Sequence, residues 1–339
     1  MYNAKYLSSL YNHNLIKQII WYGIGIFIFI VSKCINTKNI FKYSFILYII
    51  SIVLLIYVLV FGKVINGAKA WITIKGLSFQ PSELTKLSLA IMLSDLAGKF
   101  KSTGIKSEFI FLLKVAILIL IPSVLVFLEP DSGAIIFFLV ITLAILIFSD
   151  IHKFWFTIVF ILIALFIGGF ILLYLYNKDL LINLIGTSFF YRVERLITFK
   201  TMSSYQLENA LVAMGSSSLL GTGLGKVSLY IPEAPTDFIF AFSISNFGYL
   251  CGFIILSCYY LMDLFLINKI INMKKNTLKY ILISFTSIFL FGQIINIGMN
   301  LGLLPIIGIP LPFLSYGGST LIIYFIFLSI IFNSFEKSY

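Results

Sequence analysis

Residues 44–62 read SFILYIISIVLLIYVLVFG, an apolar run without a single charged side chain. A run of about 17–25 apolar residues is long enough to cross a hydrocarbon core of roughly 30 Å as an α-helix. Eight further predominantly apolar segments lie at 18–32, 84–98, 109–128, 133–149, 155–176, 238–265, 281–302 and 315–333. The sequence therefore predicts an all-α polytopic membrane protein with about nine transmembrane helices.

The composition supports this fold class. Of the 339 residues, 60% are hydrophobic and only 11% are charged, which leaves too little polar surface for a soluble domain. We expect residues 1–339 to form a single transmembrane domain. The one long stretch between spans, 177–236, is half apolar, and we expect it to be a large extracytoplasmic loop that partly re-enters the membrane. Loops of this length tend to be functional.

The distribution of charge predicts an orientation. The chain has a net charge of +11, and its clustered lysines lie mainly in the short loops around 33–43, 96–108 and 266–279. Short loops rich in Lys and Arg usually face the cytoplasm. This predicts that the N-terminus lies on the outer face of the membrane. We expect membrane lipids as partners of the basic residues, and no nucleic acid.

Histidine and cysteine do not form a recognisable site. The two histidines, His13 and His152, are far apart, and the three cysteines have unrelated spacings near apolar segments. We therefore expect no disulfide framework, no protein-bound metal cluster and no histidine-based catalysis. Carboxylates, Lys, Arg and hydroxyl groups are left for any chemistry.

Polar clusters occur where apolar segments begin or end. In GAKAWITIKGLSFQPSELTKL (67–87), Ser82 can cap the following helix, and Glu83 and Lys86 have the spacing of an ion pair on one helix face. The alternative is that Glu83 and Lys86 line a functional cavity, because ionisable residues at membrane depth are usually functional. In LEPDSGA (128–134), Asp131 is most simply a helix N-cap.

Two more clusters follow in the long loop. YRVERLITF (191–199) carries Arg192 and Arg195 beside aromatic residues. This predicts either an interfacial amphipathic helix or a cradle for a pyrophosphate. In IPEAPTDFIF (231–240), Asp237 stands where a cap is favoured, but capping does not explain Glu233 and the flanking prolines. The glycines of the preceding GTGLG follow no strand, so a nucleotide loop is excluded.

Together these clusters resemble the SEDS family (shape, elongation, division and sporulation), whose members include RodA, FtsW and SpoVE. The matching motifs occur in family order: FQPSELTKL, EPDSGA, YRVERLITF, YQLENALVAMGSSSLLGTGLG, PEAPTDFIFA and LGLLPIIGIPLPFLSYGGS. The resemblance implies a peptidoglycan glycosyltransferase that polymerises lipid II at the extracytoplasmic face, alongside a class B penicillin-binding protein. It implies a role in elongation, division or sporulation.

The resemblance also implies roles for residues. Asp237 matches the family's essential aspartate and would be the general base. Other candidate substrate-binding residues are Glu83, Lys86, Lys69, Asp131, Arg192, Arg195 and Glu233. Lys69, Arg192 and Arg195 are the candidates for stabilising the departing pyrophosphate, and a divalent cation (Mg or Mn) is an alternative; no other cofactor is expected.

The sequence departs from the family pattern in three places. The family usually has ten spans, and this chain begins where the second would begin. Ser245 and Asn246 replace a pair of glutamates, and Pro235 replaces a histidine. The alternatives to a polymerase are a flippase for lipid-linked precursors and a weakly active scaffold for a transpeptidase. The crowding of charge at one set of helix ends favours surface chemistry over transport.

Overall fold

A computed structural model describes residues 4–32, 37–65, 68–74, 77–187, 190, 194, 205–223 and 229–336. The helices are α1 (Ala4–Ser32), α2 (Thr37–Lys42), α3 (Ser44–Phe61), α4 (Pro81–Lys99), α5 (Ile105–Leu128), α6 (Ser132–Phe148), α7 (Phe154–Tyr176), α8 (Lys178–Ile185), α10 (Tyr205–Gly215), α11 (Ile239–Asn272), α12 (Thr277–Asn300) and α13 (Gly318–Glu336). The strands are β1 (Lys63–Ile65), β2 (Ala68–Ile74) and β3 (Leu77–Phe79). The expected all-α polytopic class is confirmed.

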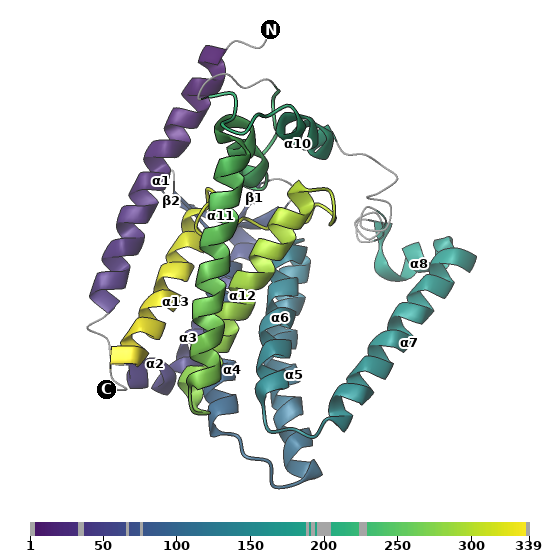
Figure 1. The fold of residues 1–339 in the computed structure, drawn as a ribbon. Helices are drawn as coiled ribbons and strands as arrows, with labels where there is room; N and C mark the ends of the chain where they lie inside the picture. The colour runs from purple at the N-terminus through teal and green to yellow at the C-terminus, as the bar shows by residue number, and fades with distance from the viewer. Residues whose placement is uncertain are drawn as a thin grey trace.

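A helix occupies each of the nine segments predicted to span the membrane (Figure 1). Six of them are long and apolar enough to cross it: α1, α3, α5, α7, α11 and α12. Helices α6 and α13 are apolar but shorter, and α4 carries four charged side chains along its length. The number of crossings stays a prediction.

The centre of the bundle is formed by α4 and α12. In α12, 72% of the span is buried inside the protein, whereas none of the span of α7 is. Helix α4 contacts α3, α6 and α12, and it hides serine and threonine side chains from the lipid. Helix α7 leans away from the bundle (Figure 1). Polar side chains therefore concentrate on the helices that touch protein on all sides, as expected in a membrane.

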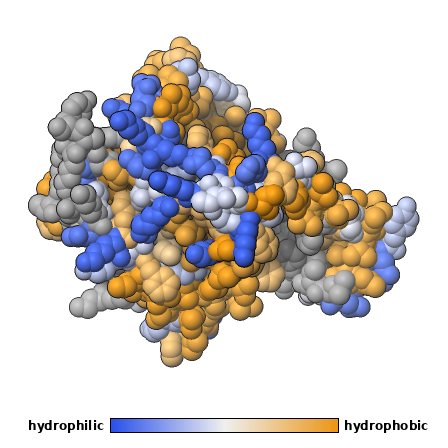
Figure 2. Space-filling model, turned by 90° about the horizontal axis from the view of Figure 1, so that it is seen from below, coloured by the Kyte–Doolittle hydropathy of each residue, from blue (hydrophilic) through white to orange (hydrophobic). Residues whose placement is uncertain are grey.

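The two ends of the bundle differ. The upper end in Figure 1 carries the antiparallel sheet β1-β2-β3, the turn 129–131, α10 and the start of α11. The lower end carries the loops 100–104, 149–153 and 273–276. Helix α1 begins at the upper end and α13 ends at the lower end. Seen from below, hydrophilic residues gather in a band with hydrophobic residues around it (Figure 2).

Helix α11 is broken at Gly248, whose φ of 82° and ψ of 176° are not helical. The break leaves backbone amides and carbonyls of α11 without hydrogen-bond partners inside the helix. The segment 217–223 supplies those partners. The amides of Thr222 and Gly223 donate to the carbonyls of Ser245 and Asn246 (3.2 and 3.0 Å). Leu250 donates to the carbonyl of Leu219 (3.2 Å). A Cβ at position 248 would lie 2.1 Å from that same carbonyl oxygen, so this close approach requires glycine.

Candidate functional site

Asp237 lies in a compact turn at the upper end, directly before α11. Glu233 has a φ of 52°, and its carbonyl oxygen accepts the amides of Asp237 and Phe238 at 3.0 and 3.2 Å. Phe238 is the N-cap residue of α11, and no side chain caps this helix. The capping interpretation of Asp237 is therefore wrong. The turn is closed by the backbone of Glu233, which leaves the carboxylate of Asp237 available.

Two asparagines of α12 hold the main chain of Asp237. The side-chain amides of Asn296 and Asn300 each donate to its carbonyl oxygen at 2.9 Å. The Oδ1 atom of Asn300 accepts the amide of Ala241 at 3.0 Å, so this residue also fixes the first turn of α11. Both asparagines are 0% exposed. The sequence places them one helical turn apart, but gives no indication of what they bind.

The segment after α12 closes the other side of the turn. Ser315 donates to the carbonyl of Thr236 at 2.5 Å, and the amide of Tyr316 donates to the carbonyl of Pro235 at 2.8 Å. Gly308 has a φ of 75°, and a Cβ there would lie 3.5 Å from Oδ2 of Asp237. The carboxylate of Asp237 therefore lies next to Gly308, which has no side chain to cover it.

The electrostatic setting of Asp237 differs from that of an ordinary surface aspartate. Its carboxylate has no hydrogen-bond partner among the described residues. Burial, followed by the negative charge of Glu233, raises the pKa of Asp237 to about 6. Thr236 donates to Oε2 of Glu233 at 3.0 Å, which fixes that second carboxylate. Asp237 can thus take up and release a proton close to neutral pH.

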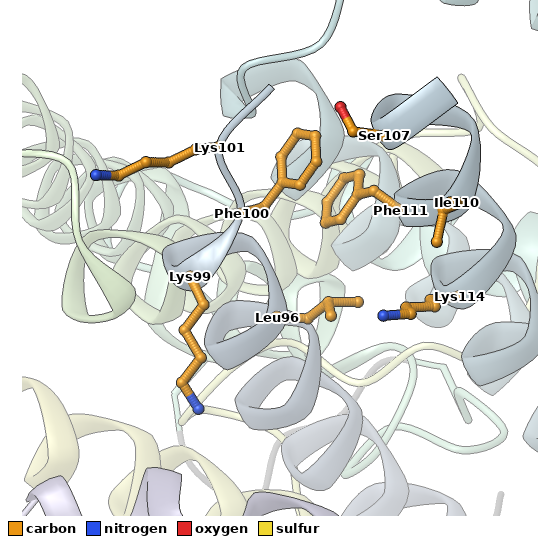
Figure 3. A pocket seen from close by; sticks show the side chains of 8 residues that line it. All are labelled: Leu96, Lys99, Phe100, Lys101, Ser107, Ile110, Phe111 and Lys114. Carbon is orange, nitrogen blue, oxygen red and sulfur yellow. The ribbon is translucent and has the colours of Figure 1, made fainter. Parts of the chain in front are cut away.

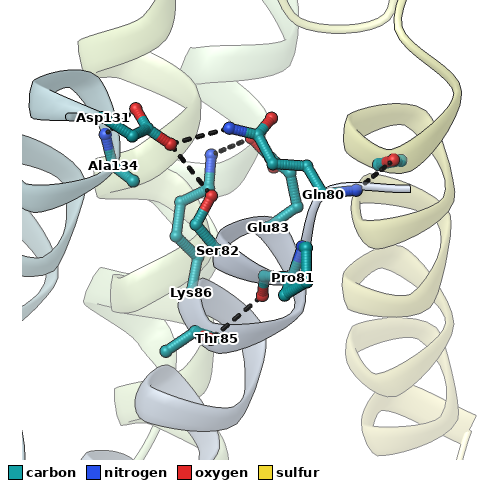
Figure 4. A network of polar contacts seen from close by, with 9 residues as sticks. Gln80, Pro81, Ser82, Glu83, Thr85, Lys86, Asp131 and Ala134 are labelled. Atoms are coloured by element: carbon teal, nitrogen blue, oxygen red, sulfur yellow. Dashed lines mark hydrogen bonds and ion pairs between the residues drawn. The ribbon is translucent and has the colours of Figure 1, made fainter. Parts of the chain in front are cut away.

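Glu83 and Lys86 form the predicted ion pair. Nζ of Lys86 lies 2.7 Å from Oε1 of Glu83 in the first turn of α4 (Figure 4). Both side chains are buried, and the ammonium lies 4.2 Å from the ring centre of Phe137, a favourable cation–π distance. The pair is satisfied within α4 and α6. Among the described residues, no hydrogen bond or ion pair joins it to Asp237.

Asp131 caps α6, as predicted, by accepting the amide of Ala134 at 3.2 Å. Its Oδ2 atom also accepts from the side chains of Gln80 (2.7 Å) and Ser82 (3.0 Å), which ties α6 to the start of α4 (Figure 4). The prediction that Ser82 caps α4 is wrong. Gln80 is the N-cap residue there, Pro81 opens the helix, and the Ser82 hydroxyl turns to Asp131 instead.

Glu129 is a buried acid that the sequence reasoning missed. It is 0% exposed, and neither of its carboxyl oxygens has a hydrogen-bond partner in the described part of the chain. Burial, and then the charge of Asp131, raises the pKa of Glu129 to about 8. The side chain is therefore neutral at pH 7, because a charged and unpaired carboxylate would be costly in this position.

The cationic candidates do not gather around Asp237 in the described chain. Lys69 lies in β2, and its ammonium donates to the carbonyl of Val60 at 3.0 Å. Arg192 and Arg195 lie outside the described residues. No group of three or more His, Cys, Asp or Glu side chains that could hold a metal ion is found in the described part of the chain.

Ser245 and Asn246 lie at the break of α11. They are 0% and 1% exposed, and the side-chain amide of Asn246 donates to the carbonyl of Phe242 at 2.8 Å. The Ser245 hydroxyl is buried without a partner among the described residues. Both residues are therefore inside the protein, and their backbone carbonyls accept hydrogen bonds from the segment 217–223.

The candidate residues with described positions share the upper end of the bundle. The segment after α12 passes close to both aspartates. A Cβ at Gly133, two residues after Asp131, would lie 3.8 Å from Ile309, and a Cβ at the adjacent Gly308 would lie 3.5 Å from Asp237. The structure thus brings Asp237 together with Glu233, Glu83 with Lys86, and Asp131 with Gln80 and Ser82. Lys69 stays separate in β2, where its ammonium contacts the end of α3.

Proteins with known sequences resemble this chain over most of its length. The chain is 35% identical over 321 residues to the probable peptidoglycan glycosyltransferase FtsW of Buchnera aphidicola subsp. Baizongia pistaciae, covering 91% of this chain and 80% of that protein. It is 33% identical over 340 residues to the protein of the same name in Wigglesworthia glossinidia brevipalpis, covering 94% of this chain and 82% of the relative.

Solved structures share the fold. A chain from a peptidoglycan synthase complex that coordinates polymerization and crosslinking superposes with a TM-score of 0.73 and 24% identity, over 95% of this chain and 89% of that one. The rod shape determining protein RodA of Thermus thermophilus gives a TM-score of 0.68 and 24% identity, over 96% and 88%. The sequence profile of the FtsW/RodA/SpoVE cell cycle proteins matches residues 1–338. The chain therefore belongs to this family.

Proposed function

We propose that the protein is a peptidoglycan glycosyltransferase that joins lipid-linked disaccharides into glycan strands, with Asp237 as its general base. The observation that carries this proposal is the unpartnered carboxylate of Asp237, with a pKa raised to about 6, held by its backbone in a turn at the helix mouth. A general base is most effective when its pKa lies near the working pH. The relatives named probable peptidoglycan glycosyltransferase support the same reaction class.

The proposed reaction is a displacement at the anomeric carbon of a lipid II donor. A hydroxyl of the acceptor sugar gives its proton to Asp237 while its oxygen bonds to that carbon. The bond from the carbon to the lipid pyrophosphate breaks, and the pyrophosphate leaves with the electron pair. Asn296 and Asn300 keep the base in place during this step, because they bind its backbone and not its carboxylate.

The further parts of the substrate site remain proposals. Glu233 is the neighbouring carboxylate whose charge raises the pKa of Asp237. Glu83, Lys86 and Asp131 would line the substrate site at the same end of the bundle. Arg192, Arg195 and Lys69 are the proposed contacts of the pyrophosphate, with a divalent cation as the alternative. The large loop 177–236 would be extracytoplasmic, and the upper end would face outward from the bacterial membrane.

We propose a class B penicillin-binding protein as the partner that crosslinks the new strands. The support is the fold shared with a chain of a synthase complex that coordinates polymerization and crosslinking.

The deciding experiment uses the purified full-length protein with its transpeptidase partner and labelled lipid II. We expect the wild type to form glycan chains and Asp237→Asn to form them about 10²–10⁴-fold more slowly. Asp150→Asn is the matched control, because Asp150 is an exposed aspartate at the lower end, paired with Lys275. Failure of the wild type to polymerise, or equal polymerisation by Asp237→Asn, would contradict the proposal.

A further inference from the structure

A cavity of about 390 Å³ opens at the lower end of the bundle, between the end of α4 and the start of α5 (Figure 3). Its walls combine three lysines with apolar and aromatic side chains. They include Leu96, Lys99, Phe100, Lys101, Phe111 and Lys114. None of these residues belongs to the candidate site around Asp237, which lies at the opposite end.

The charge of this cavity is positive and mostly uncompensated. Lys99 is paired with Asp95 of its own helix at 2.6 Å. Lys101 and Lys114 have no acidic partner in the described part of the chain. Figure 3 shows the amino group of Lys114 reaching from α5 toward Leu96, while those of Lys99 and Lys101 extend outward around the opening. The arrangement offers positive charge to an anion that arrives from the boundary of the membrane.

The depth of Lys114 points to a ligand at the membrane interface. Lys114 is nine residues after the start of α5, which is about 14 Å along the helix axis. The 24 residues of α5 are about 36 Å long, a little more than the hydrocarbon core of roughly 30 Å. By these lengths Lys114 lies about 10 Å inside the apolar region. An exposed ammonium is costly there unless its long stem carries it back to a headgroup or an anion.

The surface next to the cavity is apolar. Ile110 lines the cavity, and Leu113, Ile117 and Leu120 continue along α5 with 50–59% of their surface exposed. On the inner wall, the rings of Phe100 and Phe111 stack with their centres 4.1 Å apart. A ligand with an anionic head and apolar chains would use both the lysines and this lipid-facing stripe. A soluble anion would use only the lysines.

We propose that this cavity binds the headgroup of an anionic phospholipid, with the acyl chains lying along the exposed face of α5. Basic cavities between membrane helices are suited to phosphodiester headgroups. The site is separate from the glycan polymerase site, and its occupation does not depend on the reaction proposed for Asp237.

The test measures lipid binding to the purified full-length protein. The protein in neutral detergent is titrated with phosphatidylglycerol, with phosphatidylcholine, and with inorganic phosphate, and bound molecules are counted by native mass spectrometry. We expect phosphatidylglycerol to bind, phosphatidylcholine to bind much more weakly, and inorganic phosphate neither to bind nor to displace the lipid. Equal binding of the two lipids, or displacement by inorganic phosphate, would overturn the proposal.

Variants locate the site. Each lysine strengthens the binding of an anionic lipid roughly fivefold, so Lys101→Gln with Lys114→Gln should weaken phosphatidylglycerol binding about twenty-five-fold. Lys106→Gln is the matched control, because Lys106 is exposed on the first turn of α5 but does not line the cavity. An equal loss with Lys106→Gln would show a diffuse basic surface and refute the assignment.

Two further variants distinguish a loss of lipid binding from a loss of folding. Lys101 lies in the loop between α4 and α5, so Lys101→Gln alone leaves every helix unchanged and should still weaken binding about fivefold. Lys114→Arg should bind phosphatidylglycerol like the wild type, because it keeps the charge. If neither expectation is met, the proposal is wrong.

Discussion

Asp131 and Asp237 are two aspartates at the upper end of the same bundle, each close before a long helix, yet the protein treats them in opposite ways. The carboxylate of Asp131 accepts hydrogen bonds from Ala134, Gln80 and Ser82. The carboxylate of Asp237 accepts none from the described residues, and its backbone carbonyl is held instead by Asn296 and Asn300.

The difference separates two uses of one side chain. At Asp131 the carboxylate accepts three hydrogen bonds and ties the start of α6 to the start of α4. At Asp237 the main chain is organised by other residues, so its oxygens are left for a substrate. Half-burial without partners also explains why the pKa of Asp237 rises to about 6. Substitutions at either aspartate, or at the residues that hold or influence it, test this difference.

The largest effect is expected at the carboxylate of Asp237. Asp237→Asn keeps the shape and the backbone contacts but removes the proton acceptor. We expect glycan polymerisation to fall by about 10²–10⁴-fold, the usual contribution of a general base. Thermal unfolding in detergent should stay close to that of the wild type. A large loss of thermal stability would mean that the side chain has a structural role after all.

The second-largest effect is expected at Asn300, which holds the main chain of Asp237. Asn300→Ala removes donors to two carbonyl groups and leaves the amide of Ala241 buried without its partner. We expect polymerisation to fall by about 100-fold, because a displaced catalytic group costs that much. Stability should fall by about 1–3 kcal/mol.

The control for Asn300 is Asn272→Ala. Asn272 is an exposed asparagine at the end of α11, and its side-chain amide donates to Asn268. Both polymerisation and the unfolding temperature should be unchanged in this variant. If it is as inactive as Asn300→Ala, the loss does not report on the turn that holds Asp237.

A smaller effect, on stability, is expected at Asp131. Asp131→Ala removes the cap of α6 and leaves Gln80 and Ser82 without their acceptor. The loss should be about 2 kcal/mol in the free energy of unfolding, measured by thermal or denaturant unfolding in detergent. Asp131→Asn keeps one acceptor oxygen and should recover part of this loss. A stability equal to the wild type in Asp131→Ala would contradict the structural role.

The smallest effect is expected at Glu233, which acts on Asp237 through its charge. Asp237 must be ionised to accept a proton, so polymerisation should rise with pH through about 6. The charge of Glu233 raises this pKa, so Glu233→Gln should lower it and move the acidic limb of the pH–rate profile to lower pH. Glutamine can still accept the hydrogen bond of Thr236. A limb that stays in place, or moves to higher pH, would contradict the coupling.

Local features of the site were predictable from the sequence, and long-range ones were not. The pairing of Glu83 with Lys86 follows from their spacing on one helix face, and the cap at Asp131 from its place before α6. The main chain of Asp237 is held by Asn296 and Asn300, which are about 60 positions away (separations of 59 and 63). No local pattern encodes such a contact.

The same division holds for the fold. Apolar runs predicted where helices lie, because the length of a span is set by the membrane. The break of α11 was missed, because a glycine such as Gly248 inside the apolar segment 238–265 is tolerated in a continuous helix. The break is stable only because the segment 217–223 reaches it. The strands β1 to β3 were missed as well, since short strands depend on pairing with each other and not on a strong local signal.

The break at Gly248 also divides α11 mechanically. The longer part, after the break, belongs to a helix long and apolar enough to cross a membrane, so its tilt should depend on the membrane's thickness. The shorter part, residues 239–247, is fastened to α12 through Asn300 and Ala241. We expect tilting of the long part to be taken up at the joint before it reaches Asp237. Such a joint would let the protein adapt to changing lipid surroundings while its proposed proton acceptor stays fixed in position.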